Sequence, residues 1–337
     1  MIRAALTVAF AVVSSTTSAL AAPAVGTRLS VEASGDFLTH SQVYDRARAN
    51  GHGRRYDFKP MLRVIKPMIA GADLALCHLE TPLWFGAPAG YPTFRTPPAL
   101  ANAIKGAGFD VCSTASNHTL DIGQRGVNTT IKVLNRVGLQ HTGSYRTKAA
   151  SRHTTFLSAK GVRVAFLAYT ALTNGQRIPH PWTLNMAKAS KIIHDDRIAR
   201  RRGADAVVVN LHWGTEYQHA PSALQRSLAS KLTRSKYITA VVGQHVHVVQ
   251  PIRWIHGKPV VYGEGNLLSG QTRRGTPDGM IVFVDLRAFT TGVRAVRVRY
   301  LPTFVKHPSY TVVRAAGHSR RRTIKFVGRS ARVVPIR

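Results

Sequence analysis

The stretch from residue 109 to residue 121 reads FDVCSTASNHTLD. Its first half is a short apolar run, typical of a buried strand, and polar residues follow where that run ends. Similar apolar runs recur along the chain, and segments with helical spacing of their apolar residues separate them. This alternation predicts an α/β fold with a mainly parallel sheet that is covered by helices.

The same reading gives the expected elements. Strands are expected at residues 29–35, 72–79, 109–115, 162–169, 206–211 and 238–242. Helices are expected at residues 58–71, 99–106 and 184–202, and around 127–134 and 224–232. Beyond residue 258 the pattern predicts strands alone, at 259–262, 280–285 and 293–301, with a loop at Ser319–Arg322. These C-terminal strands suggest a second sheet stacked on the first.

Polar side chains follow the predicted strands where each one ends. These residues are Asp36, Glu80, Asn117 with His118, His212, and His245 with His247. Each alone has an ordinary explanation, such as a turn, a solvated strand end or a core histidine. Because the carboxyl ends of parallel strands converge on one edge, so many together favour a real site. Their chemistry suits Mn, Fe or Zn, and a paired metal site could clamp a phosphoryl or carbonyl oxygen.

The charge balance is strongly basic. Lys and Arg number 47 against 15 Asp and Glu, a formal net charge of +32, and 44% of residues are hydrophobic. That hydrophobic share excludes a disordered polycation. The excess of base indicates a polyanion nearby, which could be a wall polymer, an acidic capsule, nucleic acid or anionic lipid, although an arginine-rich coding bias would give the same count.

The first residues resemble an export signal. One basic residue precedes the apolar run Ala4–Val13, and small residues follow up to Ala24. This pattern predicts a signal peptide over residues 1–21, with cleavage after Ala21 or Ala24 and an uncleaved signal anchor as the alternative. No later run is long enough for a membrane span. We therefore expect a secreted or cell-surface protein, and nucleic acid is an unlikely partner because no known DNA- or RNA-binding spacing is present.

The chain has two cysteines, Cys77 and Cys112, both inside apolar strand-like runs. In an oxidising compartment they could form a disulfide. Free thiols also behave as small buried hydrophobes, and the sequence alone favours that interpretation.

Six segments, taken in order, resemble a known family. They are Gly35-Asp36, His78–Leu83, Gly108–Gly123, His212–Tyr217, Gly243–His247, and Tyr262 with Gly265-Asn266. They look like the CapA (poly-γ-glutamate capsule biosynthesis) family over roughly residues 29–270. The resemblance implies a four-layer αββα sandwich of the calcineurin-like metallophosphatase type. Residues 271–337 would then be a basic, β-rich C-terminal extension packed on the same domain.

The resemblance also implies roles for the strand-end residues. One or two divalent ions (Mn, Fe or Zn) would be held by Asp36, Glu80, Asn117, His212, His245 and His247, with Glu80 the better candidate to bridge two ions. His118, oriented by Asp121, would be the general acid or the donor to a developing oxyanion. Glu216 would orient His212 or act as a base.

The chain departs from the family pattern near the first ligand. Leu38 stands where metallophosphatases usually have a histidine, and His78 stands where the CapA pattern has Asn. The expected function is an exported metal-dependent hydrolase that cleaves a phosphoester or polymer bond during synthesis of an anionic polymer of the poly-γ-glutamate type. The alternatives are a non-catalytic polyanion-binding or export factor, and a metal-free acid–base enzyme on the same scaffold.

Overall fold

Apolar side chains at alternate strand positions hold two sheets face to face. Val31 and Leu76 of one sheet share a buried cluster with Val164 and Val208 of the other. Most of the intervening residues of β2 and β7 are apolar too, because helices cover the outer face of each sheet, whereas β1 carries the buried polar residues Glu32 and Ser34. The computed structural model describes residues 22–336, so the predicted signal peptide at residues 1–21 lies outside the described residues.

The first sheet has nine strands, with the order β14-β13-β12-β1-β2-β3-β4, while β11 pairs with β1 and β15 with β13. The strands β1, β2, β3 and β4 are parallel, whereas β12, β13 and β14 run antiparallel to their neighbours in this order. The bounds are β1 (Arg28–Leu38), β2 (Leu74–Leu79), β3 (Val111–Ser113), β4 (Gln140–Thr142), β11 (Asn266–Ser269), β12 (Asp278–Phe289), β13 (Gly292–Lys306), β14 (Thr311–Arg314) and β15 (Val333–Pro335).

The second sheet has six strands, with the order β5-β6-β7-β8-β10-β9. Its four central strands are parallel, and the two edge strands are antiparallel to their neighbours. The bounds are β5 (Thr155–Ala159), β6 (Val162–Thr170), β7 (Ala206–His212), β8 (Ile238–Gln244), β9 (Ile252–Ile255) and β10 (Lys258–Val261).

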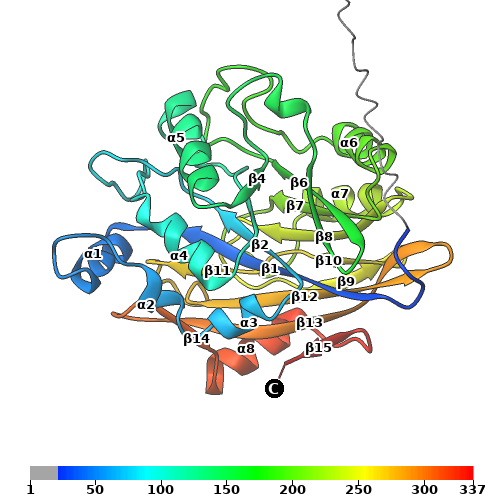
Figure 1. Ribbon diagram of the computed structural model, residues 1–337. Helices are drawn as coiled ribbons and strands as arrows, with labels where there is room; N and C mark the ends of the chain where they lie inside the picture. Colours follow the sequence, from blue (N-terminus) through cyan, green and yellow to red (C-terminus); the bar gives the residue numbers. More distant parts are fainter. Residues whose placement is uncertain (1–21, 337) are drawn as a thin grey trace, which may run out of the picture.

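Helices form the two outer layers (Figure 1). The outer face of the first sheet packs on α1 (Ser41–Asn50), α2 (Lys59–Leu62), α3 (Lys66–Ala70), α4 (Ala99–Ala107) and α5 (Gly123–Arg136). The outer face of the second packs on α6 (Ala189–Arg201) and α7 (Ala223–Thr233). A single 3₁₀ turn lies at Ala150–Arg152. The fold is therefore the predicted α/β sandwich of four layers. None of the helices in residues 22–336 combines the length and apolarity that crossing a bilayer requires.

Two of the predicted helices have different limits. The segment 58–71 forms two short helices, because Pro60 and Pro67 each sit in a first turn and Pro67 cannot donate the hydrogen bond that would continue α2. The helix expected from Leu184 begins only at Ala189, since Leu184 and Met186 form isolated bridges to Ser144 and Thr170.

The C-terminal part was predicted incorrectly in two respects. The long strands β12 and β13 do not build the second sheet but extend the first, because β12 pairs with β1 along most of its length. Ser319–Arg322 is no loop but part of α8 (Gly317–Val327). Thr323 and Val327, four residues apart, are buried, and Arg322 pairs with the buried Asp278, so a run of charged residues concealed a helix.

Cys77 and Cys112 form a disulfide, which corrects the expectation of free thiols. The two residues lie opposite each other on the neighbouring strands β2 and β3. Sequence spacing alone gave no sign of this register, because 35 residues separate them.

Candidate metal centre

The predicted ligands meet at the carboxyl ends of strands from both sheets. Asp36 lies in β1, Glu80 directly follows β2, and His212 is the last residue of β7. Asn117 comes from the loop after β3, and His245 and His247 follow β8. All six are buried, none more than 3% exposed. Parallel strands thus gather residues that are more than 200 positions apart, as the sequence predicted.

A break in the strand pattern brings both histidines of the His-x-His segment to the cluster. His245 and His247 have φ angles of +92° and +59°, so the chain turns immediately after β8 instead of alternating. The Nδ1 of His247 lies 3.1 Å from Asp36 Oδ2 and 3.0 Å from Asn266 Oδ1. The backbone N–H of His245 donates to Asp36 Oδ1 over 3.3 Å. Asp36 is thereby fixed by the segment that carries two other ligands.

Four overlapping groups of three residues have the geometry of metal sites, because their ligand atoms lie within 4.8 Å of one another. Glu80 belongs to two of these groups, one with Asp36 and His247 and the other with His212 and His245. A carboxylate shared in this way is placed to bridge two ions. The other two groups are Asp36 with His78 and His212, and Glu216 with His245 and His247.

The Glu80 carboxylate gives the strongest sign that a cation fits here. Both of its oxygens are buried and have no hydrogen-bond partner among residues 22–336, and neither does Nδ1 of His245. Oε1 lies 3.8 Å from Nε2 of His212 and 3.8 Å from Nε2 of His247. Burial raises the pKa of Glu80 well above its ordinary value. A buried carboxylate without partners is costly, and a divalent ion would remove that cost.

The histidines differ in protonation across the cluster. Burial lowers the pKa of His78 to about 4 and that of His245 to about 3, so both are neutral and ready to act as ligands. Burial also favours the neutral form of His247, but Glu80 and Asp36 outweigh it and raise the pKa of His247 to about 9. In the metal-free cluster, His247 is therefore protonated at neutral pH.

His118 lies beside the cluster, and its ring is held in place by Asp121 and Phe94. Its Nδ1 is 2.9 Å from Asp121 Oδ2, and the ring packs edge-on against Phe94 at 4.7 Å. Asp121 also accepts from the backbone N–H of Phe94 and from the Gln176 side chain, over 2.7 and 2.9 Å. These contacts fix the carboxylate, which in turn fixes the imidazole, as the sequence interpretation required.

Glu216 does not orient His212, contrary to one of its two expected roles. The ring nitrogens of His212 are both engaged elsewhere, with His78 Nε2 at 2.9 Å and Asn117 Oδ1 at 2.8 Å. Glu216 instead groups with His245 and His247 on a less buried side of the cluster. Its role as a base stays a prediction.

Three residues near the site were not among the predicted ones. His78 enters a ligand group because it pairs in register with Asp36 on the neighbouring strand, whereas Leu38 adds no ligand. The sequence showed His78 only as a departure from the family pattern, and its place in a ligand group follows from the pairing of β2 with β1. Asn266 contacts His247, and Gln176 holds Asp121. No sequence pattern indicated Gln176, because it lies in a loop.

The comparison with protein families decides the relationship. The family described as bacterial capsule synthesis protein PGA_cap matches residues 30–271. This chain belongs to the PGA_cap family. It is 27% identical to the capsule biosynthesis protein CapA of Bacillus anthracis over 277 residues, covering 79% of this chain and 66% of that protein. It is 26% identical to the PGA biosynthesis protein CapA of Bacillus subtilis over 240 residues, covering 69% and 62%. The PGA_cap chain thus spans about two thirds of the length of these relatives.

Solved structures share the fold at low sequence identity. A calcineurin-like phosphoesterase of Bacillus subtilis, YfkN, is 15% identical with a TM-score of 0.54, and the match covers 89% of this chain and 96% of that one. A phosphatase of Mycoplasma pneumoniae is 13% identical with a TM-score of 0.51, covering 85% and 96%. The PGA_cap chain therefore has the calcineurin-like metallophosphatase fold that the sequence resemblance implied.

Proposed function

We propose that this PGA_cap protein is an exported, metal-dependent hydrolase that cleaves a phosphoester or polymer bond during synthesis of a poly-γ-glutamate-type polymer. The observation that carries the proposal is the buried, unpartnered carboxylate of Glu80, which two ligand groups share. Asp36, Asn117, His212, His245 and His247 complete the set that would hold one or two ions. Mn, Fe or Zn bound there would supply Lewis acidity and neutralise negative charge on the substrate.

The chain's own residues account for the proton transfer. Asp121 accepts from Nδ1 of His118, which leaves Nε2 of the same ring to face the reacting group. From there His118 donates a proton to the leaving oxygen or nitrogen. Because Asp121 is itself held by Phe94 and Gln176, the ring stays aligned without reorganising during the reaction.

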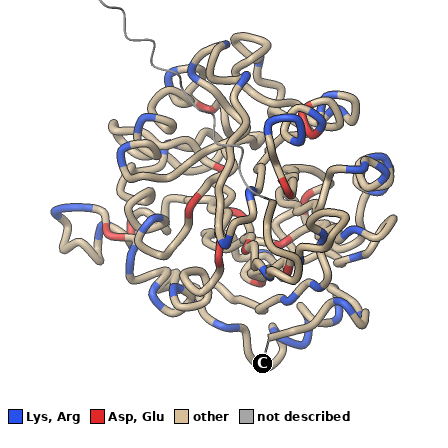
Figure 2. The backbone as a smooth tube through the Cα atoms, turned by 45° about the vertical axis from the view of Figure 1, so that its right-hand side comes forward, with Lys and Arg blue, Asp and Glu red and all other residues tan. Residues whose placement is uncertain are grey.

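Two features support export and an anionic substrate. The Cys77–Cys112 disulfide is typical of proteins that fold outside the cytoplasm, which agrees with the predicted signal peptide. Figure 2 shows Lys and Arg spread around the periphery, while several acidic residues lie in the interior. A surface of this kind attracts anionic polymers and speeds their encounter with the site.

The test is a hydrolysis assay on the purified chain, loaded in turn with Mn, Fe and Zn, with an aryl phosphodiester and with poly-γ-glutamate as substrates. We expect metal-dependent cleavage of at least one substrate by the wild type, and its loss in His212→Ala. The matched control is His52→Ala, which removes an exposed histidine that belongs to none of the four ligand groups.

Two other results would replace the proposal with one of its alternatives. Activity that survives both EDTA and Glu80→Gln would identify a metal-free acid–base enzyme. Absence of cleavage, together with salt-dependent polymer binding that survives loss of Asp36, His212 and His245, would identify a non-catalytic polymer-binding factor.

A further inference from the structure

A second hollow lies at the opposite end of the strands that carry the metal ligands. Its cavity volume is about 710 Å³, within the usual range of ligand sites. Asp205 precedes β7, and Ile238 begins β8, so the hollow opens at the amino ends of both strands. His212 and His245 lie at the carboxyl ends of the same strands. Seven strand residues separate the two regions, which corresponds to about 20 Å.

Cationic side chains dominate the lining of this region, which we call the cationic hollow. Five Lys or Arg residues line it against a single acidic residue, and they are Arg200, Lys236, Lys258, Arg294 and Arg332. None of the five forms an ion pair within residues 22–336. The ion pairs observed there involve other Lys and Arg residues. Asp205 itself accepts from the backbone N–H of Arg163 over 2.8 Å. Asp205 in the lining, and Asp196 near Lys258, therefore offset only part of the positive charge of the hollow.

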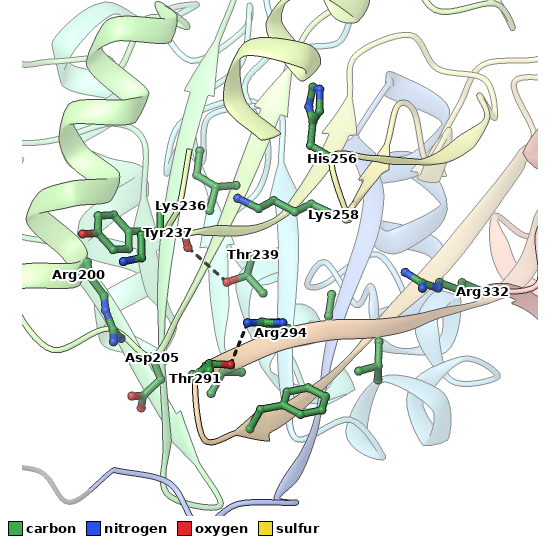
Figure 3. A pocket seen from close by; sticks show the side chains of 17 residues that line it. Arg200, Asp205, Lys236, Tyr237, Thr239, His256, Lys258, Thr291, Arg294 and Arg332 are labelled. Atoms are coloured by element: carbon green, nitrogen blue, oxygen red, sulfur yellow. Dashed lines mark hydrogen bonds between the residues drawn. The ribbon is translucent and has the colours of Figure 1, made fainter. Parts of the chain in front are cut away.

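Neutral contacts hold several of these cations in place. Arg294 donates to Thr291 Oγ1 over 2.8 Å, and the Arg332 guanidinium lies 4.9 Å from the centre of the Trp254 ring. Lys258 donates to the backbone carbonyl of Ser235. Figure 3 shows Arg200 and Arg332 on opposite sides of the hollow, with Lys258 and Arg294 between them. Such contacts restrict the side chains and leave their charge available to a ligand.

Apolar side chains lie between the cations. Ile238 and Val293 are buried in the lining, and Phe289 and Val296 are each 37% exposed at its edge. A ligand that matches this surface carries anionic groups on a chain with apolar methylenes. Guanidinium groups bind carboxylates through paired hydrogen bonds, whereas a polyphosphate has no apolar part to place on these side chains.

We propose that the cationic hollow is a second binding site, separate from the metal centre, that holds a segment of a polymer with a carboxylate on each repeat. The choice of polymer rests on the proposed function, but the site itself rests on the unpaired cations and the apolar lining. Holding one segment about 20 Å from the metal centre raises the local concentration of the rest of the chain at that centre.

The test compares two double variants that remove the same charge. Binding of a fluorescent γ-glutamate oligomer is measured by anisotropy in about 0.15 M salt with EDTA present. Arg294→Ala/Arg332→Ala is expected to weaken binding about five- to tenfold, since two charge-assisted contacts are lost. Arg54→Ala/Arg55→Ala removes two exposed arginines after α1 and is expected to change binding less than about twofold. Equal losses in both variants would show diffuse attraction and overturn the proposal.

Two further measurements distinguish specific carboxylate binding from a damaged fold and from binding of any polyanion. Arg294→Lys/Arg332→Lys keeps the charge but not the paired hydrogen bonds, so it is expected to bind more weakly than the wild type and more tightly than the alanine variant, which distinguishes lost contacts from a damaged fold. Inorganic polyphosphate that competes as strongly as the oligomer at equal charge would overturn the carboxylate assignment. Because binding is measured without metal or turnover, a failed hydrolysis assay and a failed binding assay remain distinguishable.

Discussion

Charged and ligand residues are arranged differently at the two ends of β7 and β8. At the carboxyl ends, His212 and His245 lie buried beside Glu80, and their ligand atoms lie within 4.8 Å of one another. At the amino ends, the cations of the hollow are largely exposed and form no ion pair within residues 22–336. The first arrangement selects a small ion by geometry, and the second attracts a large anion by charge.

This difference has a consequence for mutation. A buried cluster with shared ligands depends on each member, so single substitutions should have large effects. An exposed set of cations adds many weak contributions, so single substitutions there should have small effects. The following predictions test this contrast, beginning with the largest expected effect.

Replacing His118 should reduce the rate of hydrolysis strongly while leaving the metal ligands in place. We expect His118→Ala to lower kcat by about 10²–10⁴-fold for a substrate with a poor leaving group, because proton donation is lost. The loss should be much smaller for a nitrophenyl ester, whose leaving group needs no proton. Steady-state kinetics on both substrates measure the contrast, and Asp121→Asn should show a weaker form of it. Equal losses on both substrates would contradict the proton-donor role.

Removing the disulfide should weaken the fold beneath the metal centre. The bond joins β2 and β3 a few residues before Glu80 and Asn117, and it closes a loop with a sequence separation of 35 residues. We expect Cys77→Ala/Cys112→Ala to lower the free energy of unfolding by about 3–4 kcal/mol. Guanidinium titration of the oxidised wild type and the variant measures it. Oligomer binding at the cationic hollow should persist in this variant under native conditions. If the variant lost both oligomer binding and metal binding, the two ends of the strands would not differ in their dependence on the disulfide.

Metal binding should strengthen as the pH rises. Burial lowers the pKa of His247, but Glu80 and Asp36 outweigh it and raise that pKa to about 9, so an ion must displace a proton at neutral pH. Below about pH 9 this proton should weaken the metal affinity up to about tenfold per pH unit. Calorimetry in two buffers of different ionisation enthalpy counts the protons released. No proton release near neutral pH would show that His247 is not a ligand.

A change in salt concentration should have the smallest effect of the four, and it should affect oligomer binding at one end of the strands but not metal binding at the other. Raising the salt from about 0.1 to about 0.3 M should weaken oligomer binding severalfold, because the exposed cations are screened. The metal content of the same protein should hardly change, because the ligands are buried. Metal loss in parallel with polymer release would mean that the two ends are not independent.

Much of this architecture could be predicted from the sequence, and the failures have local causes. Buried parallel strands appeared as apolar runs, so the strand ends and their polar residues could be located without a structure. The Cys77–Cys112 pairing depended on register between strands, which spacing does not encode. The helix at Gly317–Val327 was hidden because a run of three arginines interrupts its apolar spacing.

The site itself was predictable for residues that follow strands, and less so for others. Asp36, Glu80 and His212 needed only the rule that strand ends converge. His78 and Gln176 required three-dimensional information, because one acts through pairing with β1 and the other lies in a loop. The cationic hollow was invisible in the sequence, since its cations come from segments as far apart as Arg200 and Arg332.

The central claim is that Glu80 completes a buried metal centre, and elemental analysis tests it most directly. The purified wild type, Glu80→Gln and Asp45→Asn are equilibrated with Mn, Fe or Zn, desalted and measured for bound metal. Asp45 is an exposed carboxylate on α1 and serves as the matched control. We predict about one or two equivalents in the wild type and in Asp45→Asn, and about tenfold less in Glu80→Gln. Equal metal content in all three proteins, or none in the wild type, would contradict the account.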